Sequence, residues 1–303
     1  MDKPVGMTSH DVVVRVRRAL ASPGAGHLGT LDPGASGLLI VALGAATRAI
    51  PVWQGGEKTY EATLRLGVTT RTQDLDGEVI AERPVDVSEA RVREAARAFV
   101  GAIDQVPPMV SAVRVGGRRL HDLARRGIEV ERAPRPITVA SWEWLGFALP
   151  EATFRVRCSA GTYVRTLAHD LGAALGTGAA LASLRRTRSE PFGLEQALPL
   201  AELERLAPAE SLARAGTPLD RALAILPAIA LDAAAAEAIG RGGRPSLADP
   251  ADAPVGAGPR SVVLRDPTGR ALALGELRAH PAGTGVIACP HVVFPWAVRE
   301  GRS

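Results

Sequence analysis

Apolar side chains recur along this chain with two periods, one typical of helices and one typical of strands. Thr8 and Asp11 form the pattern of a capping box ahead of an apolar and basic stretch, which predicts a helix that begins at Ser9. Helices are predicted at 9–20, 88–99, 118–126, 163–175, 200–206 and 231–239. Strands are predicted at 38–43, 58–66, 111–115, 137–145, 152–158, 261–266, 271–277 and 285–294.

The character of the chain changes in its last third. The pattern loosens after residue 188, and a passage rich in Pro, Gly, Ala and Asp at 240–259 predicts a linker or a long loop. The short strands beyond this passage predict a small β-rich domain. Because a chain of 303 residues is long enough for about two domains, we expect two, at 1–227 and 228–303.

Several classes of protein are disfavoured by the sequence. The longest apolar run, from Gly37 to Ala46, is far shorter than the roughly 20 residues that a membrane-spanning helix needs. The first residues contain no apolar core of a secretory signal, so we expect a cytoplasmic protein with no membrane contact. Cys158 and Cys289 lie far apart and match neither a disulfide framework nor a zinc ligand set, so no metal is expected.

The basic residues are unevenly spread. The formal net charge is +4, and the whole excess of basic residues lies in the first two-thirds of the chain. Seven arginines occur between Met109 and Arg135, and a second cluster consists of Arg185, Arg186 and Arg188. Arginine binds phosphate well, so these basic stripes favour a polyanionic partner. The alternative is a bias in genome composition, since 34 of the 36 basic residues are arginine.

A glycine-rich segment at 25–37 carries the candidate chemistry. It contains four glycines and a proline in thirteen residues, too many for a helix or a central strand. Pro33 biases Asp32 towards an extended backbone, so the carboxylate of Asp32 could project from a stiff turn into a cleft. On local statistics alone, an ordinary Asp-Pro-Gly β-turn is the stronger interpretation.

The segment GHLGTLDPGASGLL at 26–39 resembles the signature of the TruB-type pseudouridine synthases. Six further blocks match this family in the same order, over about residues 1–200. They are DKPVGMTS at 2–9, KTYEATLRLG at 58–67, QDLDGEV at 73–79, VPPMVSAVRVGGRRLHDLARRGIEV at 106–130, CSAGTYVRTLAHDLG at 158–172 and LRRTRSEPF at 184–192. The chain departs from the family at Val110 and His121, where many relatives carry tyrosine.

The resemblance implies an α+β fold, with a mixed-sheet catalytic domain and a small PUA-like domain at the C-terminal end. It also implies an isomerase that converts a uridine in the T-arm loop of tRNA to pseudouridine on a flipped-out base. This reaction breaks the carbon–nitrogen glycosidic bond, turns the uracil and rejoins it to the ribose through carbon 5. No cofactor and no metal are expected, because the reaction has no redox step.

The resemblance assigns three catalytic residues. Asp32 corresponds to the family's nucleophile, and attack on the base and attack on the ribose both remain open. Arg165 corresponds to the cation that keeps this carboxylate ionised, although by pattern alone it would be a helix-surface arginine. Tyr60 corresponds to the tyrosine that stacks on the target uracil near the proton leaving carbon 5. We expect Tyr163 to pack beneath Arg165.

Four more residues are expected at the substrate by the same correspondence. His27 would fill the place that the uridine leaves, Leu184 would line the pocket, and Gly29 would permit close approach. Lys3 would either contact phosphate or pack against the loop of Asp32. RNA contacts are expected from Arg118, Arg119, Arg125 and Arg126.

Three functions stay open at this point. The first is a stand-alone tRNA enzyme that recognises the T-arm stem-loop by shape, acts as a monomer and has no obligate protein partner. The second is a guide-RNA-dependent relative that modifies rRNA and needs partner proteins. The third is an RNA-binding or tRNA-folding protein whose catalysis is incidental, and the joint presence of Asp32, Tyr60 and Arg165 argues against it.

Overall fold

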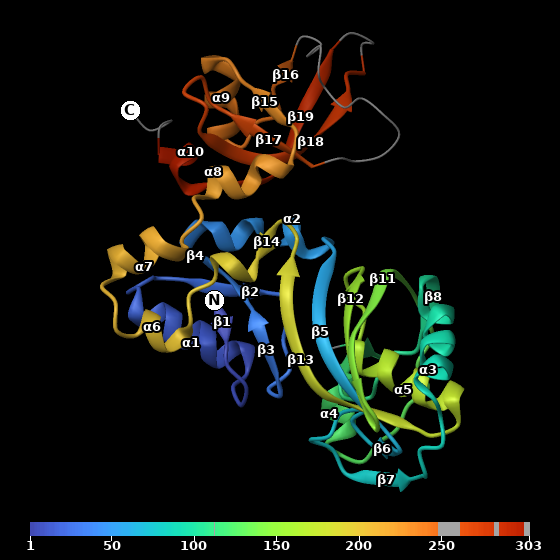
Figure 1. Ribbon diagram of the computed structural model, residues 1–303. Coiled ribbons are helices and arrows are strands. Elements are labelled where there is room, and N and C mark those ends of the chain that lie inside the picture. The colour runs from blue at the N-terminus through green and yellow to red at the C-terminus, as the bar shows by residue number, and fades with distance from the viewer. Residues whose placement is uncertain (112, 248–260, 282–284, 300–303) are drawn as a thin grey trace. The chain divides into compact units, whose positions relative to one another are not determined.

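The computed structural model describes residues 1–111, 113–247, 261–281 and 285–299. The chain forms two compact units, shown in Figure 1. Unit 1 consists of residues 1–12, 29–40 and 55–201, and unit 2 consists of 13–28, 41–54 and 202–303. Residues 13–28, 41–54 and 202–227 thus fall in unit 2, although the sequence groups them with the first domain. The boundary near 228 stays a prediction, and the sheet of unit 2 begins there.

A mixed eight-stranded sheet is the frame of unit 1. The strand order is β1-β3-β13-β5-β12-β11-β8, and β14 also pairs with β13. Strand β13 runs parallel to β3 and antiparallel to β5. The strands are β1 (Asp2–Lys3), β3 (Ala35–Leu38), β5 (Lys58–Leu66), β8 (Gly101–Gln105), β11 (Arg135–Ala148), β12 (Glu151–Cys158), β13 (Ala179–Ser189) and β14 (Phe192–Gly193). The mixed sheet and its helices confirm the α+β fold.

Two helices of unit 1 pack on this sheet. Helix α5 (Val164–Leu175) contacts β13 and β5, and α3 (Glu89–Ala96) contacts α5 and β11 (Figure 1). The inner side of α5 is apolar and buried, which fixes its orientation. Ser88 caps α3 by accepting a hydrogen bond from the backbone N–H of Arg91, as the sequence predicts.

The sequence pattern predicts the first helix correctly and fails for the apolar segment at 38–43. Helix α1 (Ser9–Ala19) begins with the predicted capping box, in which Thr8 and Asp11 bond each other's backbone N–H groups. The single strand predicted at 38–43 was wrong. The run holds the end of β3 and a separate strand, β4 (Ile40–Leu43), which pairs with β2 (Ala25–Leu28) in its own two-stranded sheet.

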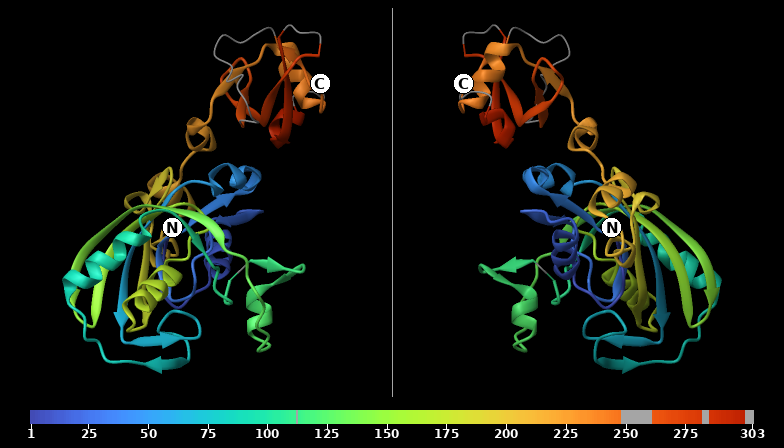
Figure 2. Two further views of the ribbon diagram at one scale, coloured as in Figure 1. Left: turned by 90° about the vertical axis from the view of Figure 1, so that its right-hand side faces the viewer. Right: turned by 90° about the vertical axis from the view of Figure 1, so that its left-hand side faces the viewer.

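Two short hairpins complete unit 1. One consists of β6 (Val68–Thr70) and β7 (Val79–Glu82). The other consists of β9 (Arg114–Val115) and β10 (Arg118–Arg119), followed by helix α4 (Leu120–Ala124). The second hairpin and α4 stand out from the sheet of unit 1, in green in Figure 2. The strand predicted at 111–115 and the helix predicted at 118–126 are both longer than β9 and α4. Gly116 and Gly117 indicate the turn, but they do not indicate how far the strand pairing extends on either side of it.

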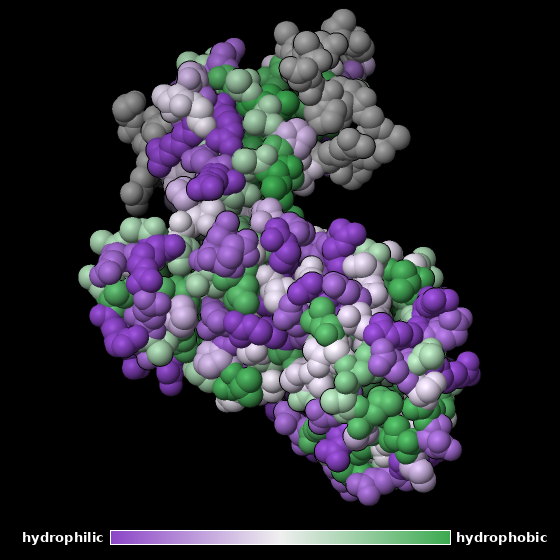
Figure 3. Space-filling view, in the orientation of Figure 1, coloured by the Kyte–Doolittle hydropathy of each residue, from purple (hydrophilic) through white to green (hydrophobic). Residues whose placement is uncertain are grey.

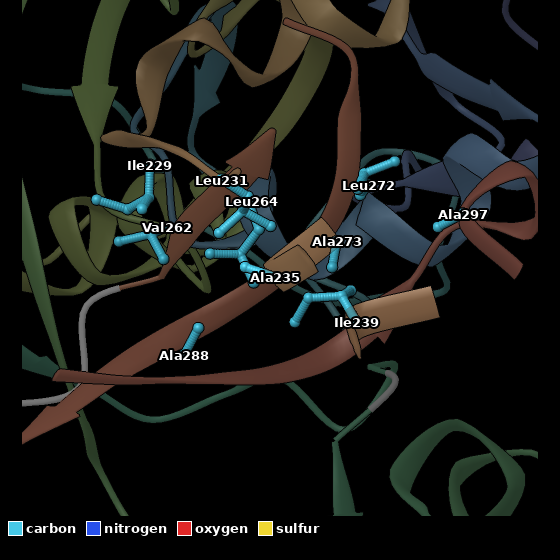
Figure 4. Packing of buried hydrophobic residues seen from close by; sticks show 10 residues of the cluster. All are labelled: Ile229, Leu231, Ala235, Ile239, Val262, Leu264, Leu272, Ala273, Ala288 and Ala297. Carbon is cyan, nitrogen blue, oxygen red and sulfur yellow. The ribbon is translucent and has the colours of Figure 1, made fainter. Parts of the chain in front are cut away.

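A five-stranded sheet forms the core of unit 2, in the order β15-β17-β18-β19-β16. Ten buried apolar residues pack between this sheet and its helices, among them Ile239, Leu264 and Leu272 (Figure 4). The strands are β15 (Ala228–Ala230), β16 (Ser246–Leu247), β17 (Val262–Arg265), β18 (Ala271–Ala279) and β19 (Val286–Val293). The helices of this part of the chain are α2 (Ile50–Gln54), α6 (Leu200–Leu203), α7 (Pro208–Ala215), α8 (Leu219–Ala222), α9 (Ala233–Gly240) and α10 (Pro295–Arg299). The three predicted C-terminal strands are confirmed, and most of the predicted linker at 240–259 lies outside the described residues.

The face shown in Figure 3 mixes hydrophilic residues with small groups of hydrophobic ones. Among the described residues, no helix is both long and apolar enough to cross a membrane.

Candidate active site

Asp32 lies in the loop that leads into β3, and this loop is tightly held. The backbone N–H of Ala35 donates to the carbonyl of Asp32 at 3.0 Å, so the predicted β-turn is present. Ser9 Oγ accepts from the N–H of Leu31 at 2.9 Å and donates to its carbonyl at 3.0 Å. The N–H of Gly6 donates to the carbonyl of Pro33 at 2.8 Å. The turn therefore presents the Asp32 carboxylate from a rigid base.

Arg165 lies beside this carboxylate. Its Nη2 is 3.3 Å from Asp32 Oδ2, and its Nη1 is 3.5 Å from Asp74 Oδ2. Nη2 also donates to the carbonyl of Val110 at 2.6 Å. The side chain of Arg165 is 6% exposed and that of Asp32 is 47% exposed. A helix-surface arginine is thereby excluded, and the buried cation has an accessible carboxylate as its partner.

The start of α5 positions Arg165. Gln105 on β8 holds both backbone groups of Tyr163, because its Oε1 accepts from the N–H at 2.8 Å and its Nε2 donates to the carbonyl at 3.0 Å. The helix begins at the next residue, Val164, so Arg165 follows in its first turn. The guanidinium carbon of Arg165 lies 5.8 Å from the centre of the Tyr163 ring, which agrees with the predicted packing.

Asp74 is a site residue that the sequence analysis did not single out. Its Oδ1 accepts a hydrogen bond from Thr72 Oγ1 at 2.5 Å, and its Oδ2 lies 3.5 Å from Arg165 Nη1. Arg165 is thus shared between two carboxylates, Asp74 on one side and Asp32 on the other. The available signal was the matched block QDLDGEV, but a pair of acids in a turn does not by itself indicate a buried arginine.

Tyr60 lies on β5 and is almost buried, with 8% of its surface exposed. Burial raises the pKa of its phenol, and the nearby Asp32 carboxylate raises it further, while Arg186 lowers it. Both predicted catalytic residues therefore lie in unit 1, near enough for the charge of Asp32 to act on the phenol. The phenol is neutral at pH 7.

Lys3 is fully buried beneath the same loop. Its Nζ donates to the carbonyls of Pro4 at 2.9 Å, Met7 at 2.7 Å and Pro33 at 3.4 Å. Burial lowers the pKa of this ammonium, and the carboxylate of Asp32 opposes that shift. Of the two expected roles, the geometry favours packing against the loop, because a fully buried ammonium offers no surface to a phosphate.

Three more predicted residues differ in where they lie. Leu184 on β13 is half-buried and opposite Ala35 of β3, within the same sheet as the Asp32 loop. Gly29 has φ of +66°, which favours glycine, and a Cβ there would lie 3.2 Å from Arg186 Nη1, while its role at the substrate stays a prediction. His27 lies on β2 in unit 2, and its role at the substrate stays a prediction.

The four predicted RNA-contact arginines, here called the hairpin arginines, lie on the second hairpin and in the turn that follows α4. They are Arg118, Arg119, Arg125 and Arg126. Arg118, Arg125 and Arg126 are exposed, and the side chain of Arg119 lies outside the described set. Arg118 and Arg126, with Arg114, line a hollow that also includes Asp122 and Leu123. The geometry thus leaves this basic surface open to an anionic partner.

The second predicted basic stripe is not a continuous surface. Arg186 is buried in the protein, whereas Arg185 and Arg188 are partly exposed. Arg185 pairs with Asp2 at 2.7 Å, and Arg188 pairs with Glu190 at 3.0 Å and with Glu195 at 3.6 Å. These arginines lie on β13, which the sequence analysis did not predict. A contact of Arg185 or Arg188 with phosphate stays a prediction.

The described residues contain no group of three or more His, Cys, Asp or Glu side chains that could hold a metal ion. Cys158 and Cys289 are both free and buried. The chemistry available at the site is therefore that of an accessible carboxylate, a buried guanidinium and a nearly buried phenol.

Comparisons with known proteins show which family this chain resembles over most of its length. Residues 17–164 match the family model described as TruB family pseudouridylate synthase (N terminal domain), and residues 165–224 match a tRNA pseudouridylate synthase B C-terminal domain. A relative from Burkholderia mallei named tRNA pseudouridine synthase B is 44% identical over 98% of this chain and 96% of its own. One from Aromatoleum aromaticum with the same name is 49% identical over 77% of this chain and 75% of its own.

Solved structures show the same fold. The chain resembles a protein in the crystal structure of a Cbf5-Nop10-Gar1 complex with a TM-score of 0.74 and 31% identity, over 97% of this chain and 83% of that one. The chain also resembles a protein in the crystal structure of the archaeal box H/ACA sRNP Nop10-Cbf5 complex, with a TM-score of 0.72 and 30% identity, over 98% of this chain and 86% of that one. Fold and site together define a pseudouridine synthase. The chain belongs to the TruB family of pseudouridylate synthases, which confirms the resemblance seen in its sequence.

Proposed function

We propose that this enzyme isomerises a uridine in the T-arm loop of tRNA to pseudouridine, with Asp32 as the nucleophile on a flipped-out base. The observation that carries the proposal is the ion pair between Asp32, which lies on a tightly held turn, and the buried Arg165 of α5. A carboxylate is a competent nucleophile only while it is ionised. Arg165 places a positive charge 3.3 Å from this carboxylate, and the partial exposure of Asp32 leaves the carboxylate open to a substrate.

The remaining residues suit a flipped uridine. Tyr60 offers a flat ring beside Asp32, and a flipped base needs such a wall together with a nearby polar atom. Leu184 contributes an apolar side chain on β13, beside the strand that follows the loop. The substrate and product contain the same atoms, so the isomerisation consumes no oxidant, reductant or group donor.

The tRNA substrate is supported by the relatives. Those from Burkholderia mallei and Aromatoleum aromaticum, at 44% and 49% identity, are both named for tRNA. The hairpin arginines give this chain an exposed basic segment for a phosphate backbone. We further propose that His27 occupies the place vacated by the flipped uridine.

A guide-RNA-dependent enzyme is the second candidate, because the similar structures come from Cbf5 complexes. Their identity to this chain, at 30% and 31%, is lower than that of the tRNA enzymes. We therefore favour an enzyme that acts on tRNA without a protein partner.

The experiment is to incubate the purified chain with an unmodified tRNA transcript and to map pseudouridine by position. We expect one modified position in the T-arm loop, with no added RNA or protein. Modification elsewhere would contradict the T-arm assignment, and activity only with an added guide RNA would favour the second candidate.

Asp32→Asn tests the nucleophile, because it removes the charge and almost no volume. We expect no pseudouridine from this variant, while filter binding to tRNA stays within a few-fold of wild type. Asp86→Asn is the matched control, since Asp86 is an exposed aspartate between β7 and α3, and it should retain full activity. Substantial turnover by Asp32→Asn would remove Asp32 from the role.

A further inference from the structure

One row of cross-strand neighbours runs under the Asp32 loop. Lys3 of β1 is opposite Gly37 of β3, Gly37 is opposite Arg186 of β13, and Arg186 is opposite Tyr60 of β5. Cross-strand neighbours project to the same side of a sheet. The side chains of Lys3, Arg186 and Tyr60 therefore share one face, although they are far apart in sequence.

The glycine at position 37 allows β3 and β13 to lie close together in this row. Its φ is +97°, and a Cβ there would lie 2.3 Å from the carbonyl oxygen of Arg186 and 2.8 Å from its backbone nitrogen. Both atoms belong to the backbone of β13, which cannot move aside without breaking its pairing with β5. A glycine at 37 is thus what brings Arg186 close to the Asp32 loop.

Arg186 is the largest of the fully buried side chains, with 1% of its surface exposed. Its Nε donates to the carbonyl of Leu38 at 2.8 Å, and its Nη2 donates to the carbonyl of Gly29 at 2.9 Å. It is also the cross-strand neighbour of Tyr60, and it lowers the pKa of that phenol. Within the described residues, these partners are all neutral and no carboxylate pairs with this guanidinium.

A buried charge that has only neutral partners is costly to the fold. Two carbonyls could be satisfied by a neutral donor, so hydrogen bonding alone does not explain a permanent cation here. The charge of Arg186 does have an effect on its neighbour Tyr60. The titratable groups that shift the pKa of Tyr60 are Arg186 on β13, Cys158 on β12 and Asp32 in the loop, and of these only Arg186 favours the phenolate.

We propose that Arg186 is a positioning residue for the isomerisation. Its guanidinium holds the first carbonyl of the Asp32 loop by a hydrogen bond, and its charge, on the strand beside Tyr60, stabilises negative charge on the Tyr60 oxygen. This inference rests on the proposed function, in which Tyr60 contacts the target base. Arg165 acts on Asp32 from one side, and Arg186 acts on Tyr60 from beneath.

A titration tests the electrostatic part without any RNA. The chain has two tyrosines, so a Tyr163→Phe background makes Tyr60 the only one. Fluorotyrosine incorporated during expression then reports the ionisation of Tyr60 by fluorine NMR. Because an opposite charge at close range shifts a pKa by about one to three units, Arg186→Met should raise the pKa of Tyr60 by about one unit or more. Arg186→Lys, which keeps the charge, should raise it less.

Kinetics test the positioning part in the full chain with the natural Tyr163. At saturating tRNA, single-turnover rates should fall in the order wild type, Arg186→Lys, Arg186→Met, while tRNA affinity stays within about twofold. The control is Arg188→Lys on the same strand, where the arginine is partly exposed and paired with two glutamates, and it should match wild type. If Arg186→Met fails to fold, Arg186→Gln is the second neutral variant, because its amide can still donate to the Gly29 carbonyl.

Three results would overturn the inference. The first is a Tyr60 pKa that is the same in wild type and the neutral variant, and the second is an unchanged rate. The third is an equal loss of activity in the Lys and neutral variants, which would mean that the shape of Arg186 matters and its charge does not. If wild type forms no pseudouridine in tRNA, the proposed function fails, and the titration still decides whether Arg186 acts on Tyr60.

Discussion

Replacing Arg165 perturbs the site at a single guanidinium that three groups share. Arg165→Met keeps the length of the side chain and removes its charge, so Asp32 loses its cationic partner, and Asp74 Oδ2 and the carbonyl of Val110 lose a donor. Arg165→Lys keeps the charge but has no planar fork, so one ammonium cannot reach all three acceptors. We expect activity to fall in both variants, and further in Arg165→Met.

The distances set the expected size of the loss. The separations of 3.3 Å to Asp32 and 3.5 Å to Asp74 are longer than the usual charge-assisted hydrogen bond, and Asp32 is partly screened by water. Hydrogen bonds to charged groups contribute about 1.5–3 kcal/mol, and the long separations argue for the lower end of that range. A loss of about 1.5–2 kcal/mol in transition-state stabilisation corresponds to a rate reduced roughly 10–30-fold for Arg165→Met.

The assay is single-turnover pseudouridine formation at saturating tRNA, with affinity measured separately by filter binding. Arg157→Met is a matched control, because Arg157 lies 3.3 Å from Glu57 but is 53% exposed, and such surface pairs contribute little. It should keep the wild-type rate. The reasoning is refuted if Arg165→Met retains the wild-type rate, or if Arg165→Lys is no faster than Arg165→Met.

Two further predictions concern binding and stability. Neutralising all four hairpin arginines should weaken tRNA binding and flatten its salt dependence, by about 0.7–0.9 in the log–log slope for each phosphate that the variant no longer neutralises. Binding isotherms over a salt series measure this, and an unchanged slope would mean that these arginines do not bind phosphate. Burial raises the pKa of the Cys158 thiol to about 11 from 9.0, so the folded state holds this proton more tightly than the unfolded chain. The stabilisation is fully present below pH 9 and is lost as the pH rises towards 11. Urea unfolding of wild type and of Cys158→Ala should therefore show that the difference between their free energies of unfolding shrinks over that interval. A difference that stays constant would contradict this reasoning.

Local patterns predicted the elements whose causes are local. The capping box of Thr8 and Asp11, the cap at Ser88 and the alternation along β5 all involve residues within four positions of each other. Such interactions form in the same way wherever the segment lies, so the sequence alone is sufficient for them. The same holds for the β-turn at Asp32, which turned out to be both an ordinary turn and the base of the site.

Strand β13 shows where local reasoning fails. Its second half reads LRRTRS, and three arginines in four positions indicate an exposed basic surface. In the fold, Arg186 enters the interior because Gly37 lets β3 approach and because carbonyls of Gly29 and Leu38 accept from it. Each of these partners is more than a hundred positions away in the sequence, so no local window contains them.

The sequence by itself determined the family and, through it, the prediction that Asp32, Tyr60 and Arg165 are catalytic, since the short motifs occur along the chain in the family's order. Only the tertiary structure decided which charges are paired and which are buried. It paired Asp74 with Arg165, buried Lys3 under the loop and placed Arg186 opposite Tyr60. The physical reason is that the free energy of a charge depends on its burial and on the partners facing it, and both are set by strands that meet only when the sheet forms.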